Sequence, residues 1–150
     1  MSDEYKLKIL MVDDNEDDFE TAKRASNKVD FPCELHWCES GEECIEYLND
    51  CLNNDSRKDL SMPNIIFLDI NMPGLDGKQT LSRIKQNKDL CSIPVLMFTT
   101  SANERDINEC YGMGANSYIT KPHSYNDLVK IFEVVDKYWM NVSALPVAND

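Results

Sequence analysis

Residues 64–77 have the sequence Asn64-Ile65-Ile66-Phe67-Leu68-Asp69-Ile70-Asn71-Met72-Pro73-Gly74-Leu75-Asp76-Gly77. Four apolar residues lead directly into Asp69, and a short apolar run bounded by turn signals predicts a buried strand. The Pro73-Gly74 pair ends regular structure, because proline lacks an N–H donor and glycine tolerates positive φ. Asp69 is therefore expected at the carboxyl end of a strand, where ligands bind in open α/β sheets. We take Asp69 as the reacting residue.

On either side of this strand, apolar β-prone runs alternate with helical patterns. The other strands are expected at 7–12, 33–38, 94–98 and 116–120, and the helices at 16–29, 40–52, 77–87, 103–111 and 124–140. Ser40 and Glu43 form a capping-box pattern at the second helix. Alternating strands and helices indicate right-handed crossovers and a parallel sheet covered on both faces. The fold class is α/β, a doubly wound (βα)5 arrangement of five parallel strands.

Composition excludes several classes of function. The 150 residues suffice for one domain with a proper core, and no apolar run approaches the roughly 20 residues that span a bilayer. The N-terminus lacks a secretory signal, so we expect a cytoplasmic protein. The net charge of −12 disfavours binding to nucleic acid, whose affinity rests on lysine and arginine contacts.

The six cysteines favour a simple interpretation. None of their spacings gives the paired C-x2-C of a zinc site. In a cytoplasmic chain without such pairs, we expect buried, reduced thiols.

Polar residues follow four of the predicted strands. Asp13 and Asp14 come after the first, Asp69 after the third, Thr99 after the fourth and Lys121 after the fifth. Parallel strands place these ends on one edge of the sheet. The sequence therefore predicts a site built from these side chains.

The three aspartates favour a divalent cation. Two carboxylates about 4 Å apart repel by about 4 kcal/mol at the effective dielectric near a protein surface. Oxygen ligands without histidine or cysteine favour Mg2+, which also takes a phosphate oxygen as a ligand. Such a site suits phosphoryl transfer onto Asp69, with Lys121 and Thr99 stabilising the charge of the transferring group.

Each of these residues also has a purely structural interpretation. Asp13-Asp14-Asn15 could cap the following helix, and Asp69 could cap a turn. Thr99 could be ordinary polarity at a strand end, and Lys121 a solvated lysine before Pro122. Polar residues together at four of these strand ends favour a site.

The chain resembles the receiver domain of two-component response regulators, which has a flavodoxin-like fold. The resemblance covers about residues 7–140. It rests on four motifs: Met11-Val12-Asp13-Asp14-Asn15, Phe67-Leu68-Asp69-Ile70-Asn71-Met72-Pro73-Gly74-Leu75-Asp76-Gly77, Phe98-Thr99-Thr100 and Tyr118-Ile119-Thr120-Lys121-Pro122. It implies a signalling protein of a phosphorelay that catalyses its own phosphorylation and autodephosphorylation.

The resemblance also implies the role of each site residue. Asp69 accepts phosphate from a phosphohistidine of a sensor histidine kinase or phosphotransfer protein. The metal ligands are Asp14, Asp69 and the backbone carbonyl of Asn71, with Asp13 acting through a bound water. Thr99 and Lys121 contact the phosphoryl oxygens, and a cis bond before Pro122 is expected to aim Lys121 at the site.

A switch and a partner class follow from the same resemblance. Thr99 moves to meet the phosphoryl group and Tyr118 turns inward, although Tyr118 could also be a half-buried strand tyrosine. Asn71 and Ser101 occupy positions that tune phosphate lifetime, and neither is acidic. The segment 49–64 and the Thr99-Thr100 pair are similar to stand-alone regulators that work with bacterial phytochrome-type kinases.

The C-terminal part predicts how the signal leaves the domain. We expect a receiver domain over residues 1–140, a short tail over 141–150 and no output domain, so the output is a protein contact. The last helix carries apolar residues at Val129, Val134, Tyr138 and Trp139 beyond its core stripe. We expect phosphorylation to switch a homodimer or partner surface formed by the fourth helix, fifth strand and fifth helix, and the alternative for these apolar residues is a wide core contact.

Two rival readings explain the chain less well. Phosphatases of the haloacid dehalogenase type also form an aspartyl phosphate, but they need an acid two residues on, where this chain has Asn71. A nucleotide-binding module would need a glycine-rich phosphate loop, which the sequence lacks.

Overall fold

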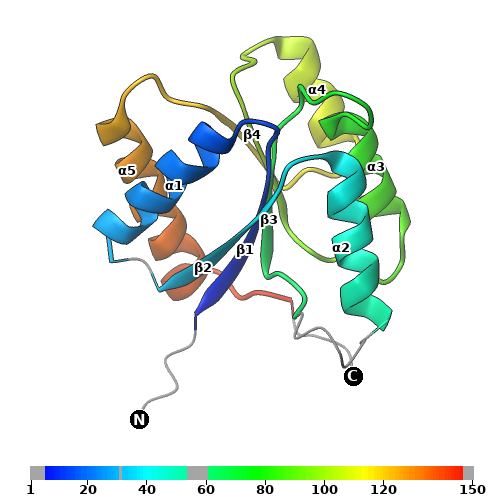
Figure 1. Cartoon of the computed structure of the whole chain (residues 1–150), viewed down its shortest axis with the longest axis horizontal. Helices are drawn as coiled ribbons and strands as arrows, with labels where there is room; N and C mark the ends of the chain where they lie inside the picture. The colour runs from blue at the N-terminus through cyan, green and yellow to red at the C-terminus, as the bar shows by residue number, and fades with distance from the viewer. Residues whose placement is uncertain (1–5, 31, 54–60, 147–150) are drawn as a thin grey trace.

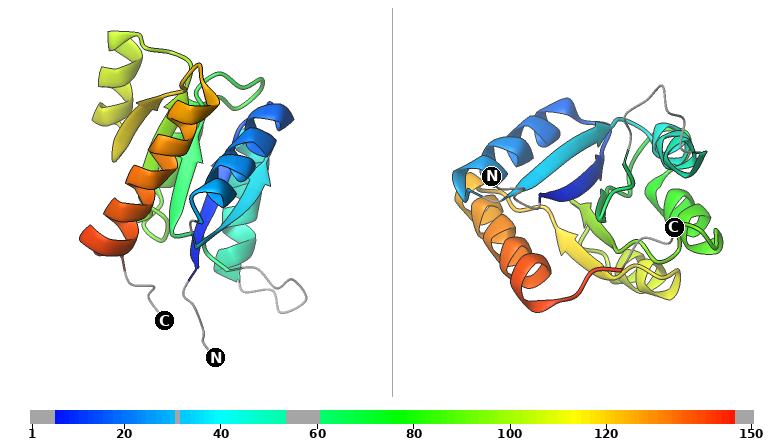
Figure 2. Two further views of the ribbon diagram at one scale, coloured as in Figure 1. Left: turned by 90° about the vertical axis from the view of Figure 1, so that its left-hand side faces the viewer. Right: turned by 90° about the horizontal axis from the view of Figure 1, so that it is seen from below.

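The computed structural model describes residues 6–30, 32–53 and 61–146. One parallel sheet has the strand order β2-β1-β3-β4-β5. Helices α1 and α5 lie on one face of the sheet, and α2, α3 and α4 lie on the other (Figures 1 and 2). The predicted α/β fold of five parallel strands covered on both faces is confirmed.

The elements follow one another in the expected order. Their bounds are β1 Leu7–Val12, α1 Glu16–Lys28, β2 Cys33–Cys38, α2 Gly41–Asn53, β3 Ile65–Leu68, α3 Gly77–Gln86, β4 Val95–Thr99, α4 Glu104–Gly112, β5 Ser117–Thr120 and α5 Tyr125–Asp136, with a π-helical turn η1 at Lys137–Val142.

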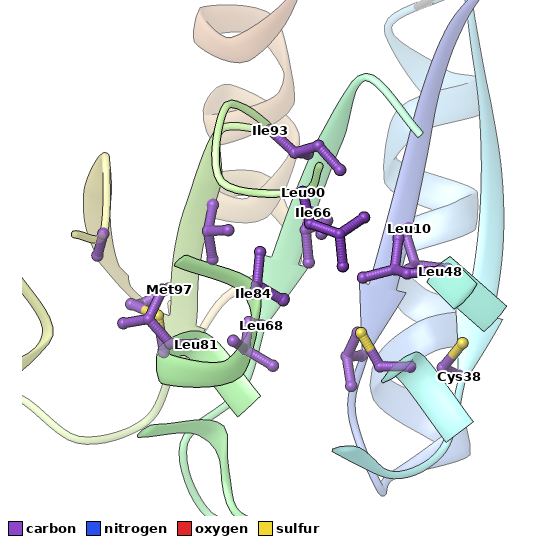
Figure 3. Close-up of a cluster of buried hydrophobic side chains, with 14 of the residues drawn as sticks. Leu10, Cys38, Leu48, Ile66, Leu68, Leu81, Ile84, Leu90, Ile93 and Met97 are labelled. Carbon is purple, nitrogen blue, oxygen red and sulfur yellow. The ribbon is translucent and has the colours of Figure 1, made fainter. Parts of the chain in front are cut away.

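The central strands are buried on both faces, which explains their continuous apolar runs. Every residue of β3 and β4 is buried, and their side chains enter two separate clusters. On the α2–α3–α4 side, residues such as Leu10, Ile66 and Ile84 pack together (Figure 3). On the α1–α5 side, Phe67 stacks on Phe132 with ring centroids 5.9 Å apart.

The helical caps differ in part from the predicted pattern. The Ser40 hydroxyl accepts a hydrogen bond from the Glu43 N–H at 3.0 Å, as expected at the start of α2. The Glu43 carboxylate, however, accepts from the Glu39 N–H at 2.9 Å and not from that of Ser40. A reciprocal capping box occurs instead at α3, between Asp76 and Gln79.

The C-terminal segment remains ordered beyond the predicted helix. The π-helical turn extends helical structure to Val142, past the expected end at Met140. Leu145 then packs against the α1–α5 cluster together with Trp139. The first residues of the predicted tail therefore cover the core, while residues 147–150 lie outside the described residues.

Two further features of the structure are the burial of the cysteine thiols and the length and polarity of the helices. All six cysteines are free; Cys38, Cys44 and Cys110 are buried, and Cys91 is exposed. Burial raises the pKa of Cys44 to about 12, so its thiol stays protonated at neutral pH. Within the described ranges, no helix has the length and apolar character needed to cross a bilayer.

Lys78 ties α3 to α4. Its ammonium lies 2.6 Å from a carboxylate oxygen of Asp106 and 2.7 Å from one of Glu109. The hydrogen bonds from Lys78 lower the pKa of both carboxyl groups. The ion pairs therefore stabilise the fold fully above the unfolded pKa values, 3.8 for Asp106 and 4.5 for Glu109. This stabilisation is lost as pH falls through the lower pKa values of the folded protein.

We expect Lys78→Met to lower the melting temperature by about 1–3 °C near neutral pH, with the difference vanishing near about pH 3. Thermal unfolding followed by circular dichroism across this range measures it. Lys88→Met, at an exposed lysine, is the matched control. A loss that is the same at every pH would show that the ion pairs of Lys78 with Asp106 and Glu109 do not tie the helices.

Candidate functional site

Sheet hydrogen bonds bring the first and third strand ends together. The Asp13 N–H donates to the carbonyl of Cys38 at 3.0 Å, and the Asp69 N–H donates to the carbonyl of Val12 at 3.0 Å. Both aspartates thus continue the pairing of β1 with its two neighbours. Their position is set by the backbone of the sheet and not by loop conformation.

The three predicted acids form a cluster. One carboxylate oxygen from each of Asp13, Asp14 and Asp69 lies within 4.8 Å of the others. Asp13 and Asp69 are buried, whereas Asp14 is exposed. The cluster is therefore open to solvent on the Asp14 side.

In both buried aspartates, the two carboxylate oxygens have different partners. Oδ1 of Asp13 accepts from the Asn15 N–H at 2.9 Å, and Oδ1 of Asp69 accepts from the Ile70 N–H at 2.8 Å. The Oδ2 atoms of both residues face Lys121. Asn15 itself caps α1 by accepting from the Asp18 N–H, so the capping interpretation holds for Asn15 but does not account for Asp13.

Gly77 lets α3 begin directly against Asp69. Its N–H donates to the carbonyl of Ile70 at 2.8 Å. A Cβ atom at this position would lie 2.0 Å from the Asp69 carbonyl oxygen, closer than any real contact. The glycine that ends the long motif is thus required by the close approach of two backbone segments.

Lys121 joins β5 to the acids. Its Nζ lies 2.6 Å from Oδ2 of Asp13, 2.8 Å from Oδ2 of Asp18 and 3.3 Å from Oδ2 of Asp69. The side chain is 10% exposed. Lys121 is therefore not the solvated lysine of the structural interpretation.

The expected cis bond before Pro122 is wrong. No peptide bond in the described ranges is cis, and the bond between Lys121 and Pro122 is among them. The Lys121 N–H donates to the carbonyl of Thr99 at 2.7 Å, which extends the pairing of β4 with β5 by one residue. This pairing, and not proline isomerisation, places the lysine over the acids.

Burial and neighbouring charges shift the pKa values of Asp13 and Lys121. Burial raises the pKa of Asp13, more than the hydrogen bonds from Lys121 and Asn15 lower it. Burial of Lys121 disfavours its ammonium form, but the hydrogen bonds to Asp13 and Asp18 together with the charges of Asp13 and Asp69 outweigh this effect, so the pKa of Lys121 is raised. The lysine stays charged and offsets only part of the negative charge around it.

Thr99 and Tyr118 are connected through Ser101. Thr99 is fully buried at the end of β4, and its hydroxyl oxygen lies 3.4 Å from the Ser101 backbone nitrogen. The Tyr118 hydroxyl donates to the carbonyl of Ser101 at 2.9 Å, and the Ser101 hydroxyl donates to Asp106 at 2.6 Å. The β4–α4 connection therefore links the end of β4 to β5 and α4.

Asn71 lies two residues beyond Asp69, after the end of β3. It is exposed and lines an open pocket of about 470 Å³ that also contains Met72, Asp76, Lys78 and Asp106. The predicted use of its carbonyl as a metal ligand stays a prediction.

Sequence reasoning missed two residues that contact the predicted ones. Asp18, in the first turn of α1, shares Lys121 with the cluster. The indole N–H of Trp37 donates to the backbone carbonyl of Asp13 at 2.8 Å. The sequence carries no signal for Asp18, because an acid in the first turn of a helix also suits the helix dipole.

The donor set suits a hard cation. Three carboxylates whose oxygens lie within 4.8 Å of one another keep a negative excess after Lys121 is counted, and all the donors are oxygen atoms. Hard divalent cations take such oxygen ligands. Asp13, Asp14 and Asp69 would hold the ion, and the solvent-open side leaves room for waters or a further oxygen ligand.

Comparison with protein families identifies the family of this chain. The model of the response regulator receiver domain matches residues 9–133. The chain belongs to this family. Receiver domains are signalling modules of two-component systems, and the aspartate cluster of this receiver domain is compatible with a phosphorylation site.

Alignments with two similar proteins extend over nearly the whole chain. The probable methanogenesis regulatory protein FilR2 of Methanothrix harundinacea is 33% identical over 138 residues, which is 92% of this chain and 86% of that protein. The response regulator Rcp1 of Synechocystis is 33% identical over 140 residues, 93% of each chain. These relatives include single-domain response regulators, as the sequence resemblance predicts.

A solved structure agrees in fold and length. The phosphorylated cyanobacterial phytochrome response regulator RcpA superimposes with a TM-score of 0.84 at 32% identity, covering 95% of this chain and 100% of that one. The resemblance to regulators that work with phytochromes is thus confirmed at the level of relatives. The family typically binds a divalent metal.

Proposed function

We propose that this receiver domain is a single-domain response regulator and that Asp69 is its phosphoacceptor. The observation that carries the proposal is the contact of Lys121 with Asp13 and Asp69 at the rim of a carboxylate cluster. A nucleophilic carboxylate, a group of acids for a cation and a fixed ammonium are the parts that phosphoryl transfer needs.

The transfer exchanges one bond for another. A carboxylate oxygen of Asp69 attacks the phosphorus of a phosphohistidine, the new O–P bond forms as the N–P bond breaks, and the imidazole leaves. Asp69 reacts in its ionised form, so no general base is required. The domain supplies the groups for its own phosphorylation, and hydrolysis of the acyl phosphate by water reverses it.

Mg2+ is the proposed cofactor, held by Asp14, Asp69 and the carbonyl of Asn71, with Asp13 acting through a water. When bound, the ion supplies charge neutralisation for the phosphoryl oxygens. Lys121 neutralises a further oxygen, and the Thr99 hydroxyl donates to another. Thr99 would exchange its contact with the Ser101 N–H for the phosphoryl group.

The β4–α4 connection carries the proposed switch. Tyr118 is bonded to the carbonyl of Ser101, two residues beyond Thr99. A movement of Thr99 toward the phosphoryl group therefore acts on the residue that holds the tyrosine. Asn71 and Ser101, at the two positions that tune phosphate lifetime, offer no carboxylate base for the attacking water.

The proposed donor is a sensor histidine kinase of the phytochrome type, or a phosphotransfer protein that relays its phosphate. The similarity to Rcp1 and RcpA supports this partner class. We propose a cytoplasmic location, which six free thiols support, because disulfides are rare in that compartment. The output would be a contact of the phosphorylated receiver, over residues 1–140, with a target protein.

Incubation with Mg2+ and acetyl phosphate, followed by intact-mass measurement, tests the phosphoacceptor. We expect one added phosphoryl group on the native protein, none on Asp69→Asn and none in excess EDTA. Asp89→Asn removes an exposed aspartate and is the matched control. Addition to Asp69→Asn at the native rate would contradict the assignment.

We also propose a homodimer through the outer face of α5 and η1. Val134 is 64% exposed, Tyr138 49% and Val142 73%, and their spacing of four residues places them on one side of the helix. The other extra apolar residues, Val129 and Trp139, pack against the core instead. The proposed dimer surface is thus confined to α5 and η1, whereas the sequence prediction also included the fourth helix and the fifth strand.

Analytical ultracentrifugation with a phosphoryl mimic tests the dimer. We expect concentration-dependent dimerisation that is lost in Val134→Asp and Tyr138→Asp. Lys130→Asp changes an exposed residue of the same helix and serves as the control. A protein that stays monomeric at high concentration with and without the mimic would contradict the homodimer.

A further inference from the structure

Three carboxylates share the ammonium of Lys121, and they do not have the same surroundings. Asp13 and Asp69 belong to the cluster in which the carboxylate oxygens lie within 4.8 Å of one another. Asp18 does not belong to that cluster, although its Oδ2 lies 2.8 Å from Nζ, closer than Oδ2 of Asp69 at 3.3 Å. One of the stronger contacts of the lysine is therefore outside the candidate metal site.

Asp18 is held firmly in place. It lies in the first turn of α1, where its N–H donates to the side chain of the capping residue Asn15. The next residue, Phe19, is buried and stacks on Trp37 with ring centroids 5.6 Å apart. The side chain of Asp18 is 41% exposed and lines a pocket of about 240 Å³ together with Lys121.

Lys121 and an entering cation would compete for the same carboxylate oxygens of Asp13 and Asp69. Oδ1 of Asp13 and Oδ1 of Asp69 each accept a backbone N–H, and Lys121 contacts the second oxygen of both residues. A cation that enters the cluster therefore meets oxygen atoms already engaged by the lysine. A phosphoryl group on Asp69 would likewise need the lysine to leave its present partners.

We propose that Asp18 is a positioning residue that acts through Lys121, as an alternative acceptor for its ammonium. This inference rests on the proposed function of Asp69 and Lys121. By drawing the lysine away from Asp13 and Asp69, Asp18 favours the entry of a divalent cation. By keeping hold of the lysine, it also opposes the contact of Lys121 with a phosphoryl group.

These two effects have opposite signs, which separates them from a general loss of structure. Without the Asp18 charge, Lys121 pairs fully with Asp13 and Asp69, so the cation binds more weakly. At saturating cation, the ion competes with Lys121 for the oxygens of Asp13 and Asp69, and Asp18 no longer retains the lysine. The lysine therefore reaches the transferring group more readily, and phosphorylation is faster. A misfolded variant would lose both properties together.

The test measures Mg2+ binding and phosphorylation separately. Trp37 reports on the site through its bond to the carbonyl of Asp13, and Trp139→Phe removes the other tryptophan of the chain. In that background, Asp18→Asn is expected to weaken Mg2+ binding about three- to fivefold. At saturating Mg2+, its rate of phosphorylation by acetyl phosphate is expected to rise by a similar factor.

Matched variants isolate the contact with Lys121. Asp17→Asn removes the same charge from an exposed neighbour in the same helical turn. We expect it to change Mg2+ binding and the phosphorylation rate by less than half as much as Asp18→Asn does. Asp18→Glu is expected to restore the native values. In a Lys121→Met background, Asp18→Asn is expected to change Mg2+ binding no more than Asp17→Asn does. Asp18→Ser is the second neutral variant if Asp18→Asn fails to fold.

Equal effects of Asp18→Asn and Asp17→Asn would overturn the inference, as would an effect of Asp18→Asn that persists after Lys121 is removed. If the native protein takes up no phosphoryl group, the proposed function fails. The Mg2+ measurements still decide the role of Asp18 in that case, because they require no phosphorylation.

Discussion

The contact between Lys121 and the carboxylates at the end of the sheet is the interaction on which the site depends. Asp13 and Asp69 are buried side by side, an arrangement that would be strongly unfavourable without a nearby positive charge. The lysine reaches them because the β4–β5 pairing continues through the Lys121 N–H. The geometry of the site is therefore a consequence of strand pairing across the whole sheet.

This charge balance is incomplete, and function follows from the imbalance. Burial still raises the pKa of Asp13 despite the lysine, which shows that its ionised form is held at a cost. A bound cation would relieve that cost, and in the proposed function a phosphoryl group on Asp69 would redistribute the lysine among its partners. In the proposed switch, the hydrogen bond from Tyr118 to the carbonyl of Ser101 would carry a movement of Thr99 to β5.

Much of this arrangement could be predicted from the sequence, since continuous apolar runs ending in Asp13, Asp69 and Thr99 define buried parallel strands with a polar edge. The prediction of a cis bond before Pro122 was wrong, because it was taken from the family resemblance, while in this chain the β4–β5 pairing places Lys121 with a trans bond. Asp18 was missed because its acidic side chain also suits the first turn of a helix. Its partner lies 103 residues away, so only the folded structure reveals the contact.

A crystal structure with Mg2+ and beryllium fluoride, a mimic of the phosphoryl group, tests the central claim most directly. The account predicts the fluoride on Asp69, the metal among the three clustered aspartates, and Nζ of Lys121 moved from Asp18 onto a fluorine atom. A mimic bound elsewhere, or a lysine that keeps its present contacts with Asp13 and Asp18 while Asp69 carries the mimic, would contradict it.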